Sequence, residues 1–175
     1  MMMYSLAQPL PATLSVRDAR GAYLAENGFT MEGYDADHTP VNVWGVRFMF
    51  PNPPSRKLAL RYHDLHHIMT GYGTDLTGEV EISAWELRRG IKGFSLFIQM
   101  IILFNVVTGF LHSPRAVWRA WRVSKEGGRC PNPSFRHYES LLKLTVGELR
   151  RLYGVPDAGL TGARRLSLDA PPQRL

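Results

Sequence analysis

The sequence predicts a mainly α-helical fold, a single-domain helical bundle that follows an irregular N-terminal region. Apolar residues recur at helical spacing after position 55, whereas the first 55 residues combine prolines with short, mixed patterns. A chain of 175 residues with 45% hydrophobic and 21% charged residues can bury one core. We therefore expect an irregular arm with a short helix and an extended segment over 1–55, a helical domain over 56–155 and a flexible tail over 156–175.

Short elements are expected in the first 55 residues. Residues 1–12 contain two prolines and predict a loose arm. Ser15 is a suitable N-cap for a helix over 13–27 that Asn27-Gly28 ends. The polar stretch 29–40 is turn-like. Partial alternation over 41–48 indicates one short strand or extended segment, which the prolines of 51–54 stop.

The rest of the chain shows successive helical patterns, over about 55–69, 76–89, 94–111, 114–125 and 135–153. Gly71-Tyr72-Gly73 breaks the first of these helices. Val80, Ala84 and Leu87, at i, i+4 and i+7, mark the core stripe of the second. Two glycines and a Pro-Asn-Pro sequence form the loop before the last helix.

One stretch has the residue types and spacing of a metal site. It reads His63-Asp64-Leu65-His66-His67 and is followed after eleven residues by Glu79. In a helix, His63 and His67 lie about 40° apart around the axis, and Asp64 lies about 60° beyond His67. Glu79, near the start of the next helix, can supply a fourth donor. Two imidazoles and two carboxylates suit zinc or a similar divalent ion, and iron and manganese are also compatible.

Neighbouring polar residues are expected to support these ligands rather than bind the metal. His66 lies about 60° on the far side of His63. Ser83 and Glu86 share a stripe with Glu79 on the following helix. Because Cys130 is the single cysteine, no disulfide within the chain and no thiolate zinc site can form. The metal cluster is the candidate centre, and no separate catalytic residue is identified.

Alternatives to a metal site stay open on spacing alone. Histidine pairs at i, i+4 also arise by chance. A zinc-protease pattern carries a glutamate general base after its first histidine, where this chain has the shorter Asp64, so a protease is disfavoured. A His-Asp phosphohydrolase needs a further histidine and aspartate, and His38 and Asp157 occupy loop-like segments.

The motif is similar to the signature of the Coq4 family of ubiquinone-biosynthesis proteins, which reads His-Asp-x-x-His, eleven residues, Glu. The similarity covers residues 61–79 and continues in Trp85-Glu86. Weaker similarity to the family occurs in 138–142 and 146–155. The resemblance covers about residues 56–155, which would make this segment the metal-binding domain. Residues 1–50 show no match to the family.

The resemblance implies a helical fold and a metal, usually zinc, held by His63, Asp64, His67 and Glu79. It implies a role in making the ubiquinone headgroup, by lyase-like removal of the C1 carboxylate of a polyprenylated hydroxybenzoate with hydroxylation of that carbon. Such a metal would anchor a carboxylate or phenolate and stabilise charge on the ring. The alternatives are a non-catalytic, prenyl-lipid-binding scaffold with a structural metal, and a helical metal-dependent hydrolase.

Two further helices bear on lipid contact. Residues 94–111 carry no charge but fall at the lower edge of the about 20 residues that a membrane span needs. We expect a buried core helix rather than a span. The resemblance favours instead a helix that lines a groove for a polyprenyl tail or rests in the bilayer. The candidate lipid or membrane contacts are Phe94, Phe97, Met100, Phe104, Arg115, Trp118, Arg119 and Arg122.

The basic helix over 114–125 suits a membrane interface because its arginines stand beside tryptophans. A solvated helix with both tryptophans packed inward is equally compatible. The net charge of +6 favours phosphate-bearing surfaces. We expect a cytoplasmic protein, without a signal peptide, at the periphery of the inner membrane.

The expected partners are a prenylated quinone precursor or other isoprenoid lipid and other quinone-biosynthesis enzymes. A homodimer stays open, and no nucleic acid is expected.

Overall fold

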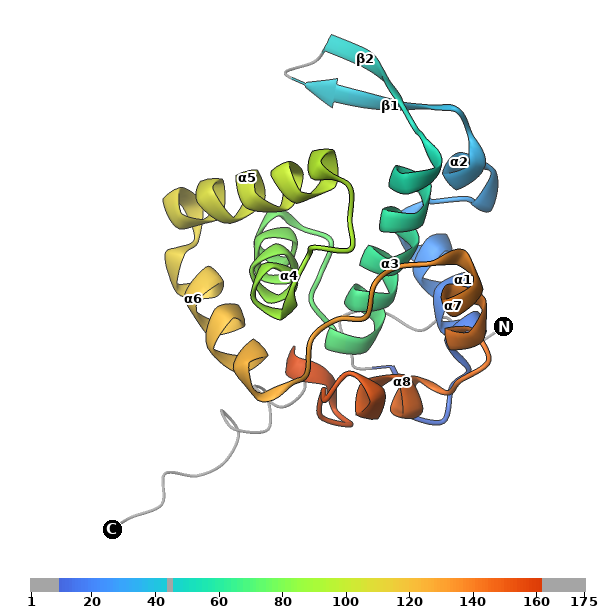
Figure 1. Cartoon of the computed structure of the whole chain (residues 1–175), viewed down its shortest axis with the longest axis vertical. Coiled ribbons are helices and arrows are strands. Elements are labelled where there is room, and N and C mark those ends of the chain that lie inside the picture. The colour runs from blue at the N-terminus through green and yellow to red at the C-terminus, as the bar shows by residue number, and fades with distance from the viewer. Residues whose placement is uncertain (1–9, 44–45, 162–175) are drawn as a thin grey trace.

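The computed structural model describes residues 10–43 and 46–161 and is mainly helical, which confirms the predicted fold class (Figure 1). The helices of the first half are α1 (Val16–Asn27), α2 (Met31–Asp35), α3 (Pro54–Thr70) and α4 (Leu76–Arg89). Those of the second half are α5 (Leu96–His112), α6 (Pro114–Val123), the 3-10 helix η1 (Ser124–Glu126), α7 (Phe135–Leu141) and α8 (Val146–Leu152). Strands β1 (His38–Val43) and β2 (Val46–Pro51) pair antiparallel.

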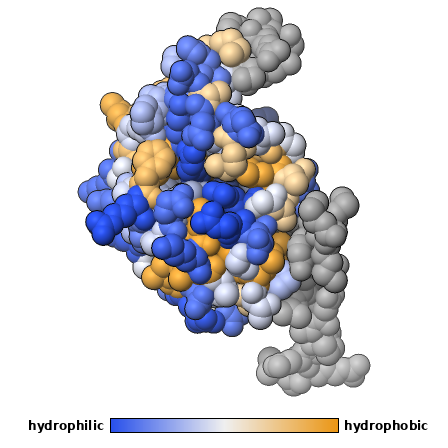
Figure 2. All heavy atoms as spheres, turned by 90° about the vertical axis from the view of Figure 1, so that its right-hand side faces the viewer, coloured by the Kyte–Doolittle hydropathy of each residue, from blue (hydrophilic) through white to orange (hydrophobic). Residues whose placement is uncertain are grey.

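Helices α3 and α4 organise the molecule. Helix α3 packs against α1, α2, α7 and α8, whereas α4 packs against α5 and α6 (Figure 1). Their buried side chains meet in one core, which includes Tyr62, Leu65, Ile82, Trp85 and Leu149. The view onto the α1 and α7 side shows hydrophilic residues interspersed with apolar ones (Figure 2).

Local capping chemistry explains where the predicted helices begin and end. The Ser15 hydroxyl accepts the Asp18 N–H at 3.0 Å, and α1 ends at Gly28, whose φ is +68°. Helix α3 ends in the same way at Gly71, with φ of +77°. The second predicted helix, over 76–89, matches α4 at both ends.

The turn-like prediction for 29–40 is wrong. Thr30 caps the short helix α2 by accepting the Gly33 N–H at 3.1 Å, and β1 begins at His38. The single strand expected over 41–48 is instead part of a hairpin, with His38 opposite Pro51 and Val43 opposite Val46. Residues 44–45 of that predicted strand lie outside the described residues. Pro51 ends β2 and Pro54 begins α3, so Asn52 and Pro53 separate the hairpin from this helix.

The single helix expected over 135–153 is also wrong, because α7 and α8 are separate. Thr145 and Glu148 form a capping box in which each side chain accepts a hydrogen bond from the other residue's backbone N–H. Beside this box the chain pairs with the start of α1. Leu144 O accepts the Val16 N–H at 2.8 Å, and Leu14 O accepts the Val146 N–H at 2.8 Å. The Thr-x-x-Glu spacing was a usable signal for this helix start.

Helix α5 does not form the buried core helix that we expected. It buries Ile98, Ile102, Val106 and Gly109 against α4 and α6. Its exposed large apolar residues are Leu96, Phe97, Met100, Ile101, Leu103, Phe104, Val107, Phe110 and Leu111. Within the described residues, no helix is both long and apolar enough to cross a membrane.

Helix α6 likewise departs from the interpretation in which both tryptophans pack inward. It buries Ala116, Val117 and Ala120, while Trp118 is 56% exposed. The core therefore takes the small side chains of α6, and the arginines and Trp118 remain on its outer faces.

Both ends of the described chain are held by one arginine. Arg150 is fully buried in α8, and its guanidinium donates to the carbonyls of Leu10, Met69 and Asp157 at 2.9, 3.0 and 2.6 Å. The backbone of the predicted arm and that of the predicted tail are thus each anchored to α8, at Leu10 and at Asp157. Residues 1–9 and 162–175 of those predictions lie outside the described residues.

Candidate metal centre

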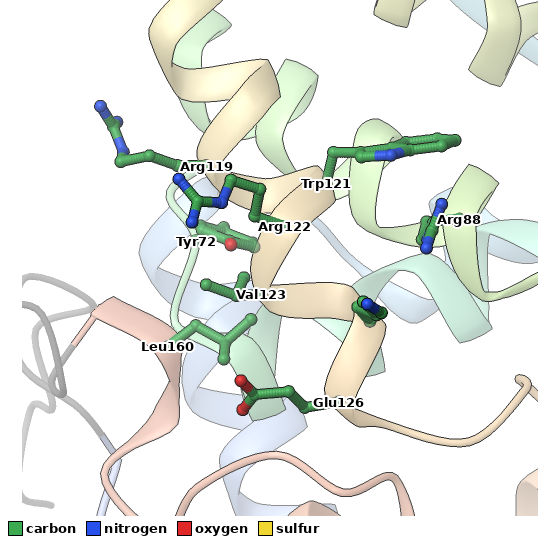
Figure 3. A pocket seen from close by; sticks show the side chains of 9 residues that line it. Tyr72, Arg88, Arg119, Trp121, Arg122, Val123, Glu126 and Leu160 are labelled. Atoms are coloured by element: carbon green, nitrogen blue, oxygen red, sulfur yellow. The ribbon is translucent and has the colours of Figure 1, made fainter.

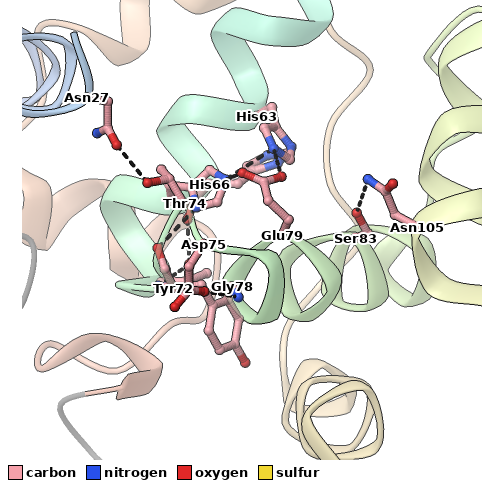
Figure 4. A network of polar contacts seen from close by, with 12 residues as sticks. Asn27, His63, His66, Tyr72, Thr74, Asp75, Gly78, Glu79, Ser83 and Asn105 are labelled. Carbon is pink, nitrogen blue, oxygen red and sulfur yellow. Dashed lines mark hydrogen bonds and ion pairs between the residues drawn. The ribbon is translucent and has the colours of Figure 1, made fainter. Parts of the chain in front are cut away.

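The candidate centre lies where α3 ends and α4 begins (Figure 4). Asp75 caps α4 by accepting the Gly78 N–H at 2.6 Å. Gly78 approaches the backbone of Gly73 so closely that a β-carbon would overlap the Gly73 carbonyl. This tight loop brings the first turn of α4, and with it Glu79, beside the last turns of α3.

Three of the four predicted ligands converge. Ligand atoms of His63, His67 and Glu79 all lie within 4.8 Å of one another. The two Nε2 atoms are 3.1 Å apart, and the Glu79 carboxylate oxygens lie 3.2 Å from His63 Nε2 and 3.4 Å from His67 Nε2. Donors around a zinc ion with bonds of about 2.0–2.1 Å are separated by about 3.3–3.4 Å in a tetrahedron. The observed separations therefore suit a zinc-sized ion.

The outer nitrogens of both histidines are already engaged. His67 Nδ1 donates to the Tyr72 carbonyl at 3.0 Å, which can only accept, and His63 Nδ1 faces Glu86 Oε1 at 3.0 Å. Each Nδ1 therefore carries a proton, and each Nε2 is directed at Glu79. Metal-ligating histidines show this arrangement, in which an outer hydrogen bond selects the tautomer and orients the ring. The donor set fits a divalent ion.

The carboxylates and imidazoles of this centre shift one another's pKa values. Burial lowers the pKa of His63, but the facing carboxylates of Glu86 and Glu79 outweigh it and raise the pKa to about 10. Burial would raise the pKa of Glu79, yet hydrogen bonds with His63 and His67 lower it to about 2. Burial would also raise the pKa of Glu86, but His63 and His66 lower it. The site thus concentrates negative charge that a cation can compensate.

Asp64, the fourth predicted ligand, is not brought into this group. Its buried carboxyl is hydrogen-bonded to Tyr23 of α1, and burial raises its pKa well above the ordinary range. The Tyr23 ring also stacks on His67, with centroids 5.9 Å apart. Asp64 therefore links α3 to α1 beside the centre.

The residues predicted to support the ligands separate into two groups. Glu86 is 2% exposed, and its Oε1 accepts from His63 Nδ1 at 3.0 Å and from His66 Nδ1 at 2.6 Å. Ser83 instead accepts from the Asn105 side chain at 3.2 Å, on the side facing α5 (Figure 4). Glu86 and His66 therefore lie beside the predicted ligand His63, whereas Ser83 points toward α5.

Sequence reasoning missed two contributors to the site. Tyr23 comes from a helix 40 residues upstream of the motif, and nothing in its local pattern singles it out. The Tyr72 carbonyl is a main-chain group in a loop, and the flanking glycines predicted only that the helix ends there.

The residues predicted to contact lipid are placed mostly at the surface. Phe97, Met100, Phe104 and Trp118 are 52, 58, 67 and 56% exposed, and Arg115 and Arg122 are exposed on α6. Phe94 is half-buried and packs against the core. Arg119 forms an ion pair with the buried Glu81 at 3.1 Å.

Comparison of the chain with protein-family models, with curated proteins and with solved structures finds no match.

Proposed function

We propose that this chain is a divalent-metal protein that acts on, or presents, a polyprenylated hydroxybenzoate in ubiquinone biosynthesis, as its resemblance to the Coq4 family implies. The observation that carries the metal assignment is the convergence of His63, His67 and Glu79, with both Nδ1 atoms engaged by other groups. The substrate assignment rests on the motif shared with that family.

Three protein ligands leave one coordination position for another oxygen donor, as in catalytic zinc sites. The side chains of Glu79 and His63 are 34% and 24% exposed, whereas that of His67 is fully buried. A small-molecule oxygen can therefore approach from the Glu79 side. A bound metal would polarise such a carboxylate or phenolate.

The protein's own groups would hold this centre in place. Glu86 accepts from His63 and Tyr72 from His67, so both rings keep their orientation without further rearrangement. We assign zinc as the ion because two imidazoles with one carboxylate form a common zinc set, and iron and manganese are the competing ions.

The exposed face of α5 supports a peripheral association with a membrane. Contiguous apolar surface on a protein marks an interaction site, and this helix exposes aromatic and aliphatic side chains along its length. Arg115 and Trp118 of α6 follow directly in the chain and suit the headgroup layer. A prenyl tail could share the same face.

Metal analysis of purified protein tests the metal assignment. We expect about one ion per chain in the unaltered protein and its loss in His63→Ala and in Glu79→Ala, because each variant removes one of three ligands. His112→Ala, an exposed histidine at the end of α5, is the matched control and should retain the ion. Absence of metal after incubation with zinc, iron and manganese would refute the assignment.

Profiling of quinone intermediates in cells that depend on this chain tests the substrate. Cells carrying His63→Ala should accumulate the polyprenylated hydroxybenzoate, while His112→Ala cells should make normal quinone. Unchanged quinone levels in His63→Ala cells would overturn the role in this pathway even if the metal site is real.

A second candidate function is a non-catalytic scaffold that carries prenyl lipids. The observation in its favour is the bridging of α3 and α4 by the proposed ligands, since a metal there would hold the two helices together. For such a scaffold, metal removal would lower the melting temperature and purified protein would never turn over substrate. A third candidate, a metal-dependent hydrolase, would instead show chelator-sensitive cleavage of simple phosphate or carboxylate esters.

A further inference from the structure

A basic pocket is lined in part by Tyr72, in the loop that follows α3, and it includes none of the three proposed metal ligands. It encloses about 660 Å³ between α6, η1, the end of α4 and Leu160 (Figure 3). This volume is within the range of small-molecule sites. The cationic side chains that line it are Arg88, Arg119, Arg122 and Lys125.

The charge of the lining is strongly positive. Four cationic side chains face a single carboxylate, that of Glu126, among the lining residues that the structure describes. Arg119 is paired with Glu81 at 3.1 Å. Within the described chain, neither Arg122 nor Lys125 has a carboxylate partner within 4.0 Å. Their charges are therefore available to an anionic ligand.

Helical spacing places three of these cations on successive turns of one short segment. Arg119, Arg122 and Lys125 follow one another at intervals of three residues through α6 and η1, so successive side chains lie on neighbouring turns. Arg88 approaches from α4, with its guanidinium 5.0 Å from the centre of the Trp121 ring. Two helices thus contribute charge to one cavity, which a single solvated helix face would not provide.

The remaining lining is apolar and aromatic. Tyr72, Trp121, Val123 and Leu160 contribute to the walls (Figure 3). An arginine pair binds phosphate oxygens with charge-assisted, often bidentate hydrogen bonds, and aromatic rings pack against the body of a ligand. A ligand with a phosphate group and an apolar or flat portion matches both parts of the lining.

We propose that this pocket binds a phosphate-bearing ligand, a phosphomonoester or a diphosphate, through Arg122, Lys125, Arg88 and Arg119. The site goes beyond the proposed metal function and does not depend on it. Tyr72 nevertheless connects the two sites: its side chain lines the pocket, and its carbonyl accepts the His67 Nδ1–H at 3.0 Å. A bound phosphate ester would pack against the residue that orients one proposed ligand.

Isothermal titration calorimetry with inorganic pyrophosphate tests the site. We expect saturable binding that Arg122→Gln weakens by about ten-fold or more, because a charge-assisted contact is lost. Arg115→Gln is the matched control, since it removes the same charge from an exposed position of α6 outside the pocket. Glu126→Gln should tighten binding by removing the opposing carboxylate. His63→Ala should bind pyrophosphate normally, which excludes chelation by the metal centre.

Vesicles distinguish the source of the phosphate. Saturable binding of free pyrophosphate identifies a soluble ligand. Binding only to phosphatidylcholine vesicles that contain phosphatidic acid, weakened by Arg122→Gln and not by Arg136→Gln, identifies a lipid headgroup; Arg136 is an exposed arginine of α7 outside the pocket and outside the proposed membrane face. Equal losses in the two arginine variants would show general charge attraction and overturn the site, as would the absence of binding to both probes.

Discussion

The Glu86 carboxylate should control the affinity of the proposed metal centre without touching the metal. Glu86→Gln keeps the length and shape of the side chain and removes its charge. In the unaltered protein, one oxygen of Glu86, Oε1, accepts two N–H groups, from His63 at 3.0 Å and from His66 at 2.6 Å. The Glu86 side chain is almost inaccessible to water. A neutral amide oxygen accepts these bonds more weakly, and the neighbouring amide group donates where Glu86 could only accept.

Loss of an outer hydrogen bond to a ligating histidine typically reduces metal affinity 10–100-fold, or about 1.4–2.7 kcal/mol. We therefore expect a drop of this size in zinc affinity, because one of the two oriented rings is affected directly. Competition with a colorimetric zinc chelator measures the affinity. Circular dichroism of the metal-free variant checks that the fold is intact.

Glu81→Gln is the matched control for this prediction. Glu81 is also buried in α4, but its carboxylate pairs with Arg119 rather than with the histidines. Zinc affinity of Glu86→Gln within three-fold of the unaltered protein would refute the role of Glu86. An equal loss in Glu81→Gln would show that helix stability, and not the orientation of His63, governs binding.

Three further predictions test the fold and the surface. Arg150→Met should lower the free energy of unfolding by about 3 kcal/mol or more, because three carbonyls lose their donor. The control Arg151→Met, at an exposed position, should change this free energy by less than about 0.5 kcal/mol. Urea denaturation measures both, and equal effects would contradict the prediction. Gly78→Ala should destabilise the protein and abolish metal binding, since its β-carbon would meet the Gly73 backbone; a normal melting temperature with full metal content would argue against this loop geometry. Phe104→Ser should leave the unfolding midpoint unchanged, because the side chain is 67% exposed, yet reduce sedimentation with anionic vesicles; unaltered sedimentation would remove α5 from the proposed membrane face.

Local signals in the sequence were sufficient for most helices. Ser15 with Gly28, and Asp75 with Gly90, bracket helices whose ends are decided by neighbouring backbone groups. The separation of α7 from α8 was missed although its Thr145 capping box is also local. The burial of α5 was misjudged for a different reason: apolar composition does not reveal how much partner surface exists, and α4 with α6 covers one side only.

Helical periodicity is enough to predict the helical class. Together with a fixed loop length, it also brings His63, His67 and Glu79 within reach of each other at one helix junction. The other contacts of the site are set by tertiary packing. Asp64 is hydrogen-bonded to Tyr23, and the Tyr72 carbonyl accepts a hydrogen bond from His67. Glu86 accepts hydrogen bonds from two histidines of the motif. Each of these depends on how separate elements pack in space, and spacing along one helix carries no information about the partner that a buried polar group will find.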